Sequence, residues 1–69
     1  MSVRWRRFVG RTVRVHLPER TVEGVLTHVS SELLILRAAS LPQPVGTEDI
    51  ALDGEVIIPR DAIQFGQVS

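Results

Sequence analysis

The first extended stretch of the chain alternates apolar and polar residues, and this period of two constrains the fold more than any other feature. Val13, Val15 and Leu17 fall on one side of an extended backbone, with polar side chains between them. A proline-containing turn at 18–20 ends the pattern. The alternation predicts a β-strand over about 11–17 with one buried face, so the rest of the chain must build a sheet that covers this face.

Two further apolar stretches follow, and a glycine lies inside the first of them. The stretch at 21–30 places Val22, Gly24 and Leu26 on one face, and a glycine inside a strand usually marks a sharp bend or a close backbone approach. The stretch at 32–39 is apolar on both faces, as in strands that are covered from both sides. Two consecutive strands, the first strongly bent, are typical of a small barrel.

A break near the C-terminus separates two short strand patterns. Alternating residues predict strands at 55–58 and 63–67. Between them, Pro59 lacks a backbone N–H and ends ladder pairing, and Asp61 can accept hydrogen bonds from turn amides. The sequence therefore predicts a tight corner between the last two strands.

The two remaining segments differ in character. The segment 40–54 holds two prolines, two glycines and three acids, and it predicts a long acidic loop. At the N-terminus, Ser2 can cap a helix over about 2–9 in which Trp5 and Phe8 share an apolar face. The predicted order is a short helix, three strands, a loop, a strand, a corner and a final strand.

The small size of the chain limits its stability. A chain of 69 residues forms one domain at most, over 1–69, and such a chain buries only about 60% of its unfolded surface. It has no cysteine, so neither a disulfide framework nor a thiolate metal site can stabilise it. We therefore expect self-association.

The longest aliphatic run, 33–36, is far too short for a membrane span, so we expect a cytoplasmic protein without membrane contact.

The formal net charge is zero, but the charges are unevenly distributed. Residues 1–20 contain six of the eight arginines and a single acid, whereas 21–69 contain two arginines and seven acids. Such a division can steer a polyanion to one surface, or it can let subunits pair head to tail. Arginine supplies every basic side chain, and its planar fork suits both phosphate groups and interfacial ion pairs.

Three segments in order resemble a known family. The stretches "VRVHL", "VEGVLTHVSSELLILR" and "IPRDAI" resemble the bacterial Sm-like RNA chaperone Hfq and, more loosely, the Sm proteins. Gly24 followed by Leu26 resembles the bent second strand of that family, and 60–63 resembles its corner. The resemblance implies a short N-terminal helix followed by a five-stranded, strongly bent antiparallel Sm-like (SH3-like) barrel.

The same resemblance implies a homo-oligomeric ring, a hexamer or a heptamer. In the family, the fourth strand of one subunit pairs with the fifth strand of its neighbour, and this pairing removes both exposed edges. The subunit-interface residues expected on this basis are Val56, Ile58, Ile63 and Phe65.

The resemblance also implies binding of single-stranded RNA, which we expect to be weak and centred on the basic N-terminal surface. The RNA-binding residues expected on this basis are Arg4, Arg6, Arg7, His16 and Arg60. His16 stands where the family has a base-stacking tyrosine, and an imidazole can also stack on a base. Asp61 beside Arg60 opposes phosphate binding at the corner. Each of these residues has a simpler interpretation as a solvated side chain, an ion-pair partner or a contact to another subunit.

The sequence contains no motif that is typical of an enzyme active site. The sequence has no phosphate-cradling glycine loop, no metal-ligand cluster beyond two separated histidines and no nucleophile elbow. We expect neither an enzyme nor a cofactor. The alternative to an RNA-binding ring is a structural or adaptor oligomer of the same fold that contacts a protein partner and binds no RNA.

Overall fold

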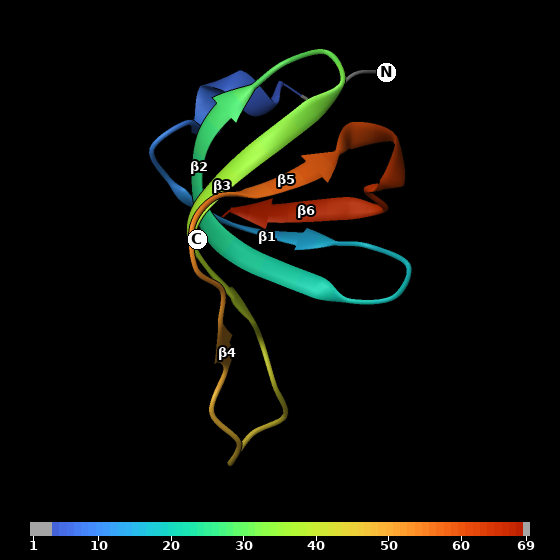
Figure 1. Cartoon of the computed structure of the whole chain (residues 1–69). Coiled ribbons are helices and arrows are strands. Elements are labelled where there is room, and N and C mark those ends of the chain that lie inside the picture. The colour runs from blue at the N-terminus through green and yellow to red at the C-terminus, as the bar shows by residue number, and fades with distance from the viewer. Residues whose placement is uncertain (1–3, 69) are drawn as a thin grey trace.

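The computed structural model describes residues 4–68, which form an almost entirely β architecture (Figure 1). The elements follow in the order η1 (Trp5–Phe8), β1 (Thr12–His16), β2 (Thr21–Val29), β3 (Leu33–Leu41), β4 (Ile50–Ala51), β5 (Val56–Pro59), η2 (Arg60–Ala62) and β6 (Phe65–Val68). Each pair of neighbouring strands is antiparallel. The prediction of a mostly β, antiparallel fold is therefore confirmed.

The strands form one sheet in the order β4-β3-β2-β1-β6, and β5 pairs with β3. β3 is long enough to hold two partners on the same side, since residues 33–36 pair with β5 and residues 40–41 pair with β4. Within the described residues, β5 and β6 are not paired with each other. The sheet is therefore open at the place where the sequence pattern predicted a barrel.

The bend predicted at Gly24 is present. β2 and β3 curve along their length (Figure 1), and their pairing shifts register between Glu23 and Val25. A Cβ atom at Gly24 would lie 3.0 Å from both the Cα atom of Ala39 and the carbonyl oxygen of Arg37. This separation is shorter than ordinary van der Waals contact, so the absence of a side chain lets the two backbones approach each other.

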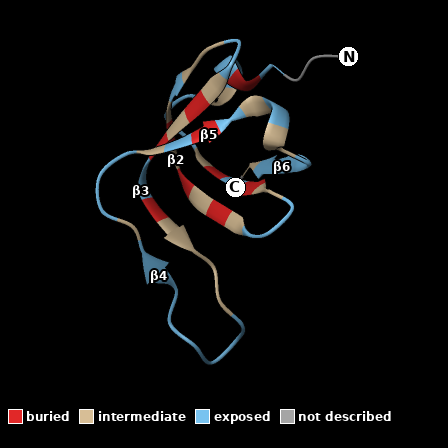
Figure 2. Cartoon of the chain, turned by 45° about the vertical axis from the view of Figure 1, so that its right-hand side comes forward, coloured by how far each residue is buried: buried red, intermediate tan, exposed pale blue. Residues whose placement is uncertain are grey.

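Buried and less buried residues alternate along the strands, so the core is built from every second residue of the sheet (Figure 2). Its buried members are Trp5, Val13, Val15, Val22, Leu26, Leu34, Leu36, Ala39 and Ile58. Full burial of one large aliphatic side chain contributes about 1.5–3 kcal/mol. The alternation that predicted β1 therefore also identified Val13 and Val15 as core residues.

The N-terminal helix is shorter than predicted. The structure shows a 3-10 turn of four residues, Trp5–Phe8, in place of a helix over 2–9, and the predicted cap Ser2 lies outside the described residues. Trp5 is buried, and its ring packs against Gly66 of β6. Tertiary packing of Trp5 therefore holds this turn, because a helix of four residues has little stability of its own. No helix within residues 4–68 is long and apolar enough to cross a membrane.

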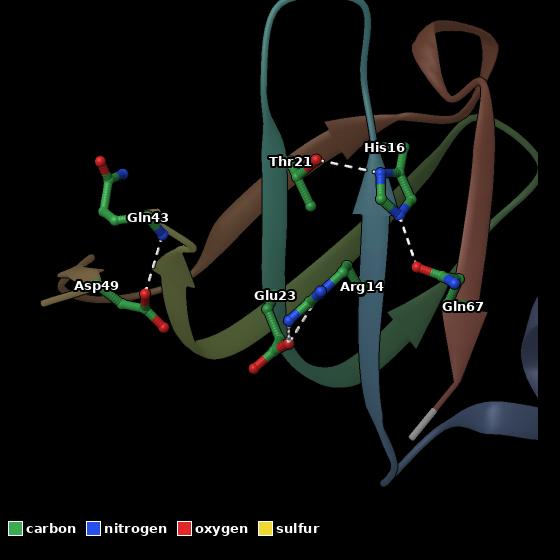
Figure 3. A network of polar contacts seen from close by, with 7 residues as sticks. All are labelled: Arg14, His16, Thr21, Glu23, Gln43, Asp49 and Gln67. Atoms are coloured by element: carbon green, nitrogen blue, oxygen red, sulfur yellow. Dashed lines mark hydrogen bonds and ion pairs between the residues drawn. The ribbon is translucent and has the colours of Figure 1, made fainter. Parts of the chain in front are cut away.

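The predicted acidic loop 40–54 contains a sixth strand that the sequence pattern did not predict. The end of β3 pairs there with β4, and the backbone N–H of Gln43 donates to Asp49 Oδ1 at 2.9 Å (Figure 3). The result is a hairpin arm, residues 40–51, that projects from the body of the molecule (Figure 1). Prolines did not prevent this pairing because they lie between the paired residues.

The predicted corner after β5 is the 3-10 turn η2. The backbone N–H of Arg60 donates to the carbonyl oxygen of Glu32 at 2.9 Å, which fixes the turn to the start of β3. The N–H of Gln64 donates to the carbonyl oxygen of His16 at 2.8 Å. β6 begins only at Phe65, later than the predicted strand over 63–67, because η2 and the residues after it complete the turn.

Candidate functional site

His16 lies between neighbouring strands and contacts both of them (Figure 3). Its Nε2 lies 2.8 Å from Gln67 Oε1 and its Nδ1 lies 3.1 Å from Thr21 Oγ1. Because the Gln67 oxygen can only accept, Nε2–H is the donor of the first hydrogen bond, and the Thr21 hydroxyl forms the second with Nδ1. The ring stacks on Phe65 with centroids 4.0 Å apart and planes inclined by 17°.

The strand register explains these contacts. His16 of β1 is paired with Thr21 of β2 and with Phe65 of β6, and paired residues on one face of a sheet have neighbouring side chains. Phe65 occupies one face of the imidazole and both ring nitrogens have partners. His16 therefore has structural contacts through both ring nitrogens and one ring face, and its base-stacking role stays a prediction.

Arg14 is also held across strands. Its Nε and Nη2 donate to Glu23 Oε2 at 3.0 and 2.8 Å (Figure 3). Arg14 and Glu23 are register partners on β1 and β2, so this exposed ion pair follows from the same pairing. The guanidinium of Arg14 thus pairs with a carboxylate on the neighbouring strand of the same sheet.

Four of the five predicted RNA-binding residues gather at one place. A surface pocket of about 350 Å³ is lined by Arg4, Trp5, Arg6, Arg7, Val29 and Arg60. We call this the arginine pocket. Its residues come from η1 and the residue before it, from the end of β2 and from η2, so segments distant in sequence meet there. The family resemblance implied a patch of three N-terminal arginines and placed Arg60 apart from them at the corner, so it gave no indication that all four share a pocket with Trp5 and Val29.

The predicted interface residues have different environments. Ile58 is 2% exposed and belongs to the core of this chain, so its side chain cannot reach a neighbour. Val56 and Ile63 are partly buried and pack against the same core. Of the four, Phe65 alone is well exposed, at 55%.

Ile57 was not predicted from the sequence, although it is the most exposed large apolar side chain of the described strands. It lies on β5 between Val56 and Ile58, and 63% of its surface is exposed. A signal was available, because Val56 and Ile58 face the core and period-two alternation then turns Ile57 outward. An aliphatic residue at an outward position marks a contact surface more clearly than its inward neighbours do.

The strands that carry Ile57 and Phe65 are both edge strands. In the part of the chain that the structure describes, β5 is paired only with β3 and β6 only with β1. Each strand therefore has one backbone edge without a strand partner. Edge strands with apolar side chains readily accept a further strand from another chain.

A second hollow, acidic in character, lies beside the corner. It measures about 330 Å³ and is lined by Ser31, Glu32, Pro59 and Asp61. Asp61 follows Arg60 directly, so this acidic hollow and the arginine pocket share η2.

Across residues 4–68 there is no group of three or more histidine, aspartate or glutamate residues that could hold a metal ion.

One solved structure resembles this chain in fold. No protein-family model matches the chain, and no curated protein matches it significantly. A chain in a solved structure described as the crystal structure of the NatC complex bound to CoA is similar, with a TM-score of 0.77 and 24% identity. The match covers 100% of this chain and 88% of that chain. At this identity the match shows that the two chains share a fold.

This comparison overturns the prediction of an Sm-like or Hfq-like ring that binds RNA. The chain of similar fold is found in the NatC complex, and it supports neither a homo-oligomeric ring nor RNA as a partner. The side chains agree with this correction, because His16 is stacked on Phe65 and Ile58 is buried. The resemblance in residues to the Sm-like family is not tested by a match of fold and stays a prediction.

Proposed function

We propose that this chain is a non-catalytic, protein-binding subunit that joins a larger assembly through the free edges of β5 and β6. The observation that carries the proposal is the exposure of Ile57 and Phe65, 63% and 55%, on two strands that each lack a second strand partner among the described residues. A strand of another protein that pairs with such an edge gains backbone hydrogen bonds and covers these side chains.

The exposed aromatic side chain on β6 is already held in one orientation by its neighbours. Phe65 stacks on His16, which is itself bonded to Gln67 and Thr21. A ring that is already held in place loses little conformational freedom when a partner covers it. This rigid aromatic side chain therefore suits the centre of an interface.

The size of the chain favours the same conclusion. A domain of 69 residues without disulfides has a small core, and contact with a second protein supplies the burial that it lacks. The match to a chain of the NatC complex supports membership of a multi-subunit assembly of that kind. Within such an assembly the proposed role of this chain is to bind and position its neighbours.

The proposal is tested by isolating the tagged chain from the cells that produce it and measuring the mass and composition of the particle. We expect a particle that contains at least one other protein in fixed proportion. Ile57→Lys together with Phe65→Lys should release the chain from this particle, because both substitutions place a charge on an apolar edge. Val45→Lys is the matched control, since Val45 is fully exposed on the hairpin arm.

The folded state of the edge variant is checked by its thermal unfolding, which should stay cooperative, with a melting temperature lowered by about 10 °C at most because the stack of Phe65 on His16 is lost. A chain that elutes as a free 7.7 kDa monomer, or only with copies of itself, would show that the proposal is wrong. Equal loss of the partner in the Val45→Lys control would show that the β5 and β6 edges are not the contact.

A further inference from the structure

The arginine pocket brings the side chains of four arginines together. Among the described residues, the side chains of Arg4, Arg6 and Arg7 have no hydrogen-bond or ion-pair partner. No acidic side chain within residues 4–68 lines the pocket. Cations held close together repel one another, and an anionic ligand placed among them relieves this repulsion.

The side chain of Arg60 is held in place within the arginine pocket by a hydrogen bond. Its Nη1 donates to the carbonyl oxygen of Ser30 at 2.7 Å, so the guanidinium is oriented before any ligand arrives. Arg60 is half-buried, whereas the other three arginines are exposed. The pocket thus has one anchored cation and three adjustable ones.

The remaining lining is apolar. Trp5 is 6% exposed and Val29 is half-buried, so the pocket lining contains apolar side chains as well as the four arginines. A ligand that fits both features combines carboxylate groups with an apolar side chain. Guanidinium groups pair with carboxylates in a bidentate geometry, and apolar surface removed from water adds to the affinity.

We propose that the arginine pocket binds an acidic segment of a partner protein that also carries apolar side chains. This inference deepens the proposed function and rests on it for the partner being a protein. The corner supplies a route to the pocket, because Arg60 follows β5 directly. A partner segment paired along β5 that continues past Pro59 reaches Arg60 next.

The same surroundings disfavour a nucleic acid. Single-stranded nucleic acids bind through exposed aromatic side chains and a continuous basic groove. The aromatic ring at this pocket, Trp5, is buried. Glu32 and Asp61 line the neighbouring hollow, so they would repel a backbone that carries a charge on every nucleotide, whereas a peptide can place uncharged residues at this point.

A short fluorescent peptide in which glutamates flank two leucines tests this inference with the purified full chain. Binding is followed by fluorescence anisotropy at low and at moderate salt. We expect saturable binding that weakens as salt rises, since the ion pairs lie near the surface. Changing Arg6→Gln and Arg7→Gln together should weaken binding by about tenfold. Arg20→Gln is the matched control, because Arg20 is exposed in the turn between β1 and β2, away from the pocket lining.

Each alternative gives a distinct result. Equal binding of a peptide with glutamines in place of the glutamates would overturn the role of charge. Tighter binding of a uridine oligonucleotide at the same arginines would overturn the choice of a protein segment, as would no binding of the acidic peptide at low salt. Because this assay needs no assembly, a chain that binds the peptide but forms no particle would refute the proposed function and leave the pocket assignment standing.

Discussion

The contact between Trp5 and Gly66 is the place where one added carbon atom should have the largest effect. A Cβ atom at Gly66 would overlap the buried Trp5 ring, with Cζ2 and Cζ3 at 3.0 and 3.1 Å. We predict that Gly66→Ala lowers the free energy of unfolding by about 1–3 kcal/mol, as overpacking of a filled core does. Urea unfolding monitored by circular dichroism measures this change.

Gly46 provides a control substitution, because an alanine there strains the backbone but overlaps no other atom. Gly46 has φ +92°, and no atom lies within 4 Å of the position that a Cβ would take, so Gly46→Ala introduces strain without a clash. That variant should lose only about 1 kcal/mol, which is the usual penalty for a left-handed alanine. If Gly66→Ala unfolded at the same urea concentration as the parent, the packing of Trp5 beneath β6 would be refuted.

At the scale of elements, the hairpin arm should be dispensable for folding. Residues 44–51 are exposed, and β4 contacts the body mainly through its pairing with the end of β3. We predict that an Asn-Gly turn joining Leu41 to Ile50 in place of residues 42–49 changes the free energy of unfolding by less than about 1 kcal/mol, because a two-residue loop of this type fits an antiparallel pair. Thermal unfolding of the trimmed chain measures this difference. A loss of cooperative unfolding would mean that the arm is part of the core structure.

The sequence predicted those elements whose pattern is local and strong, and it missed those that depend on tertiary contacts. The alternation in β1 and the glycine of β2 were sufficient to predict a bent antiparallel fold. β4 was missed because two residues carry no periodicity and its pairing with Leu41 is a tertiary contact. The arginines of the pocket could be named one by one, but their meeting with Val29 depends on how η1 and η2 pack. The stacking of Phe65 on the His16 ring could not be predicted from the sequence, because it depends on the register in which β6 pairs with β1.

At the scale of the whole molecule, stability should depend on binding. A chain of this size has a free energy of unfolding at the low end of the usual range, about 3–5 kcal/mol. A partner that binds only the folded chain, present at about 100 times its dissociation constant, should add about 2.7 kcal/mol. For a domain of this length each kcal/mol raises the melting temperature by about 4–8 °C.

Differential scanning calorimetry of the chain with and without its isolated partner measures this shift. The double variant Ile57→Lys, Phe65→Lys serves as the control, and its melting temperature should not respond to the partner. An unchanged melting temperature of the parent chain under saturating partner would contradict selective binding to the folded state.

Trp5 gives the molecule a built-in optical signal. It is the single tryptophan of the chain, and its ring packs against Gly66 while it also lines the arginine pocket. The emission wavelength and intensity of an indole depend on its contact with water and with nearby charged groups. Separation of β6 from η1 and occupation of the pocket therefore both act on one chromophore, which excitation of the unlabelled protein reports without any added dye.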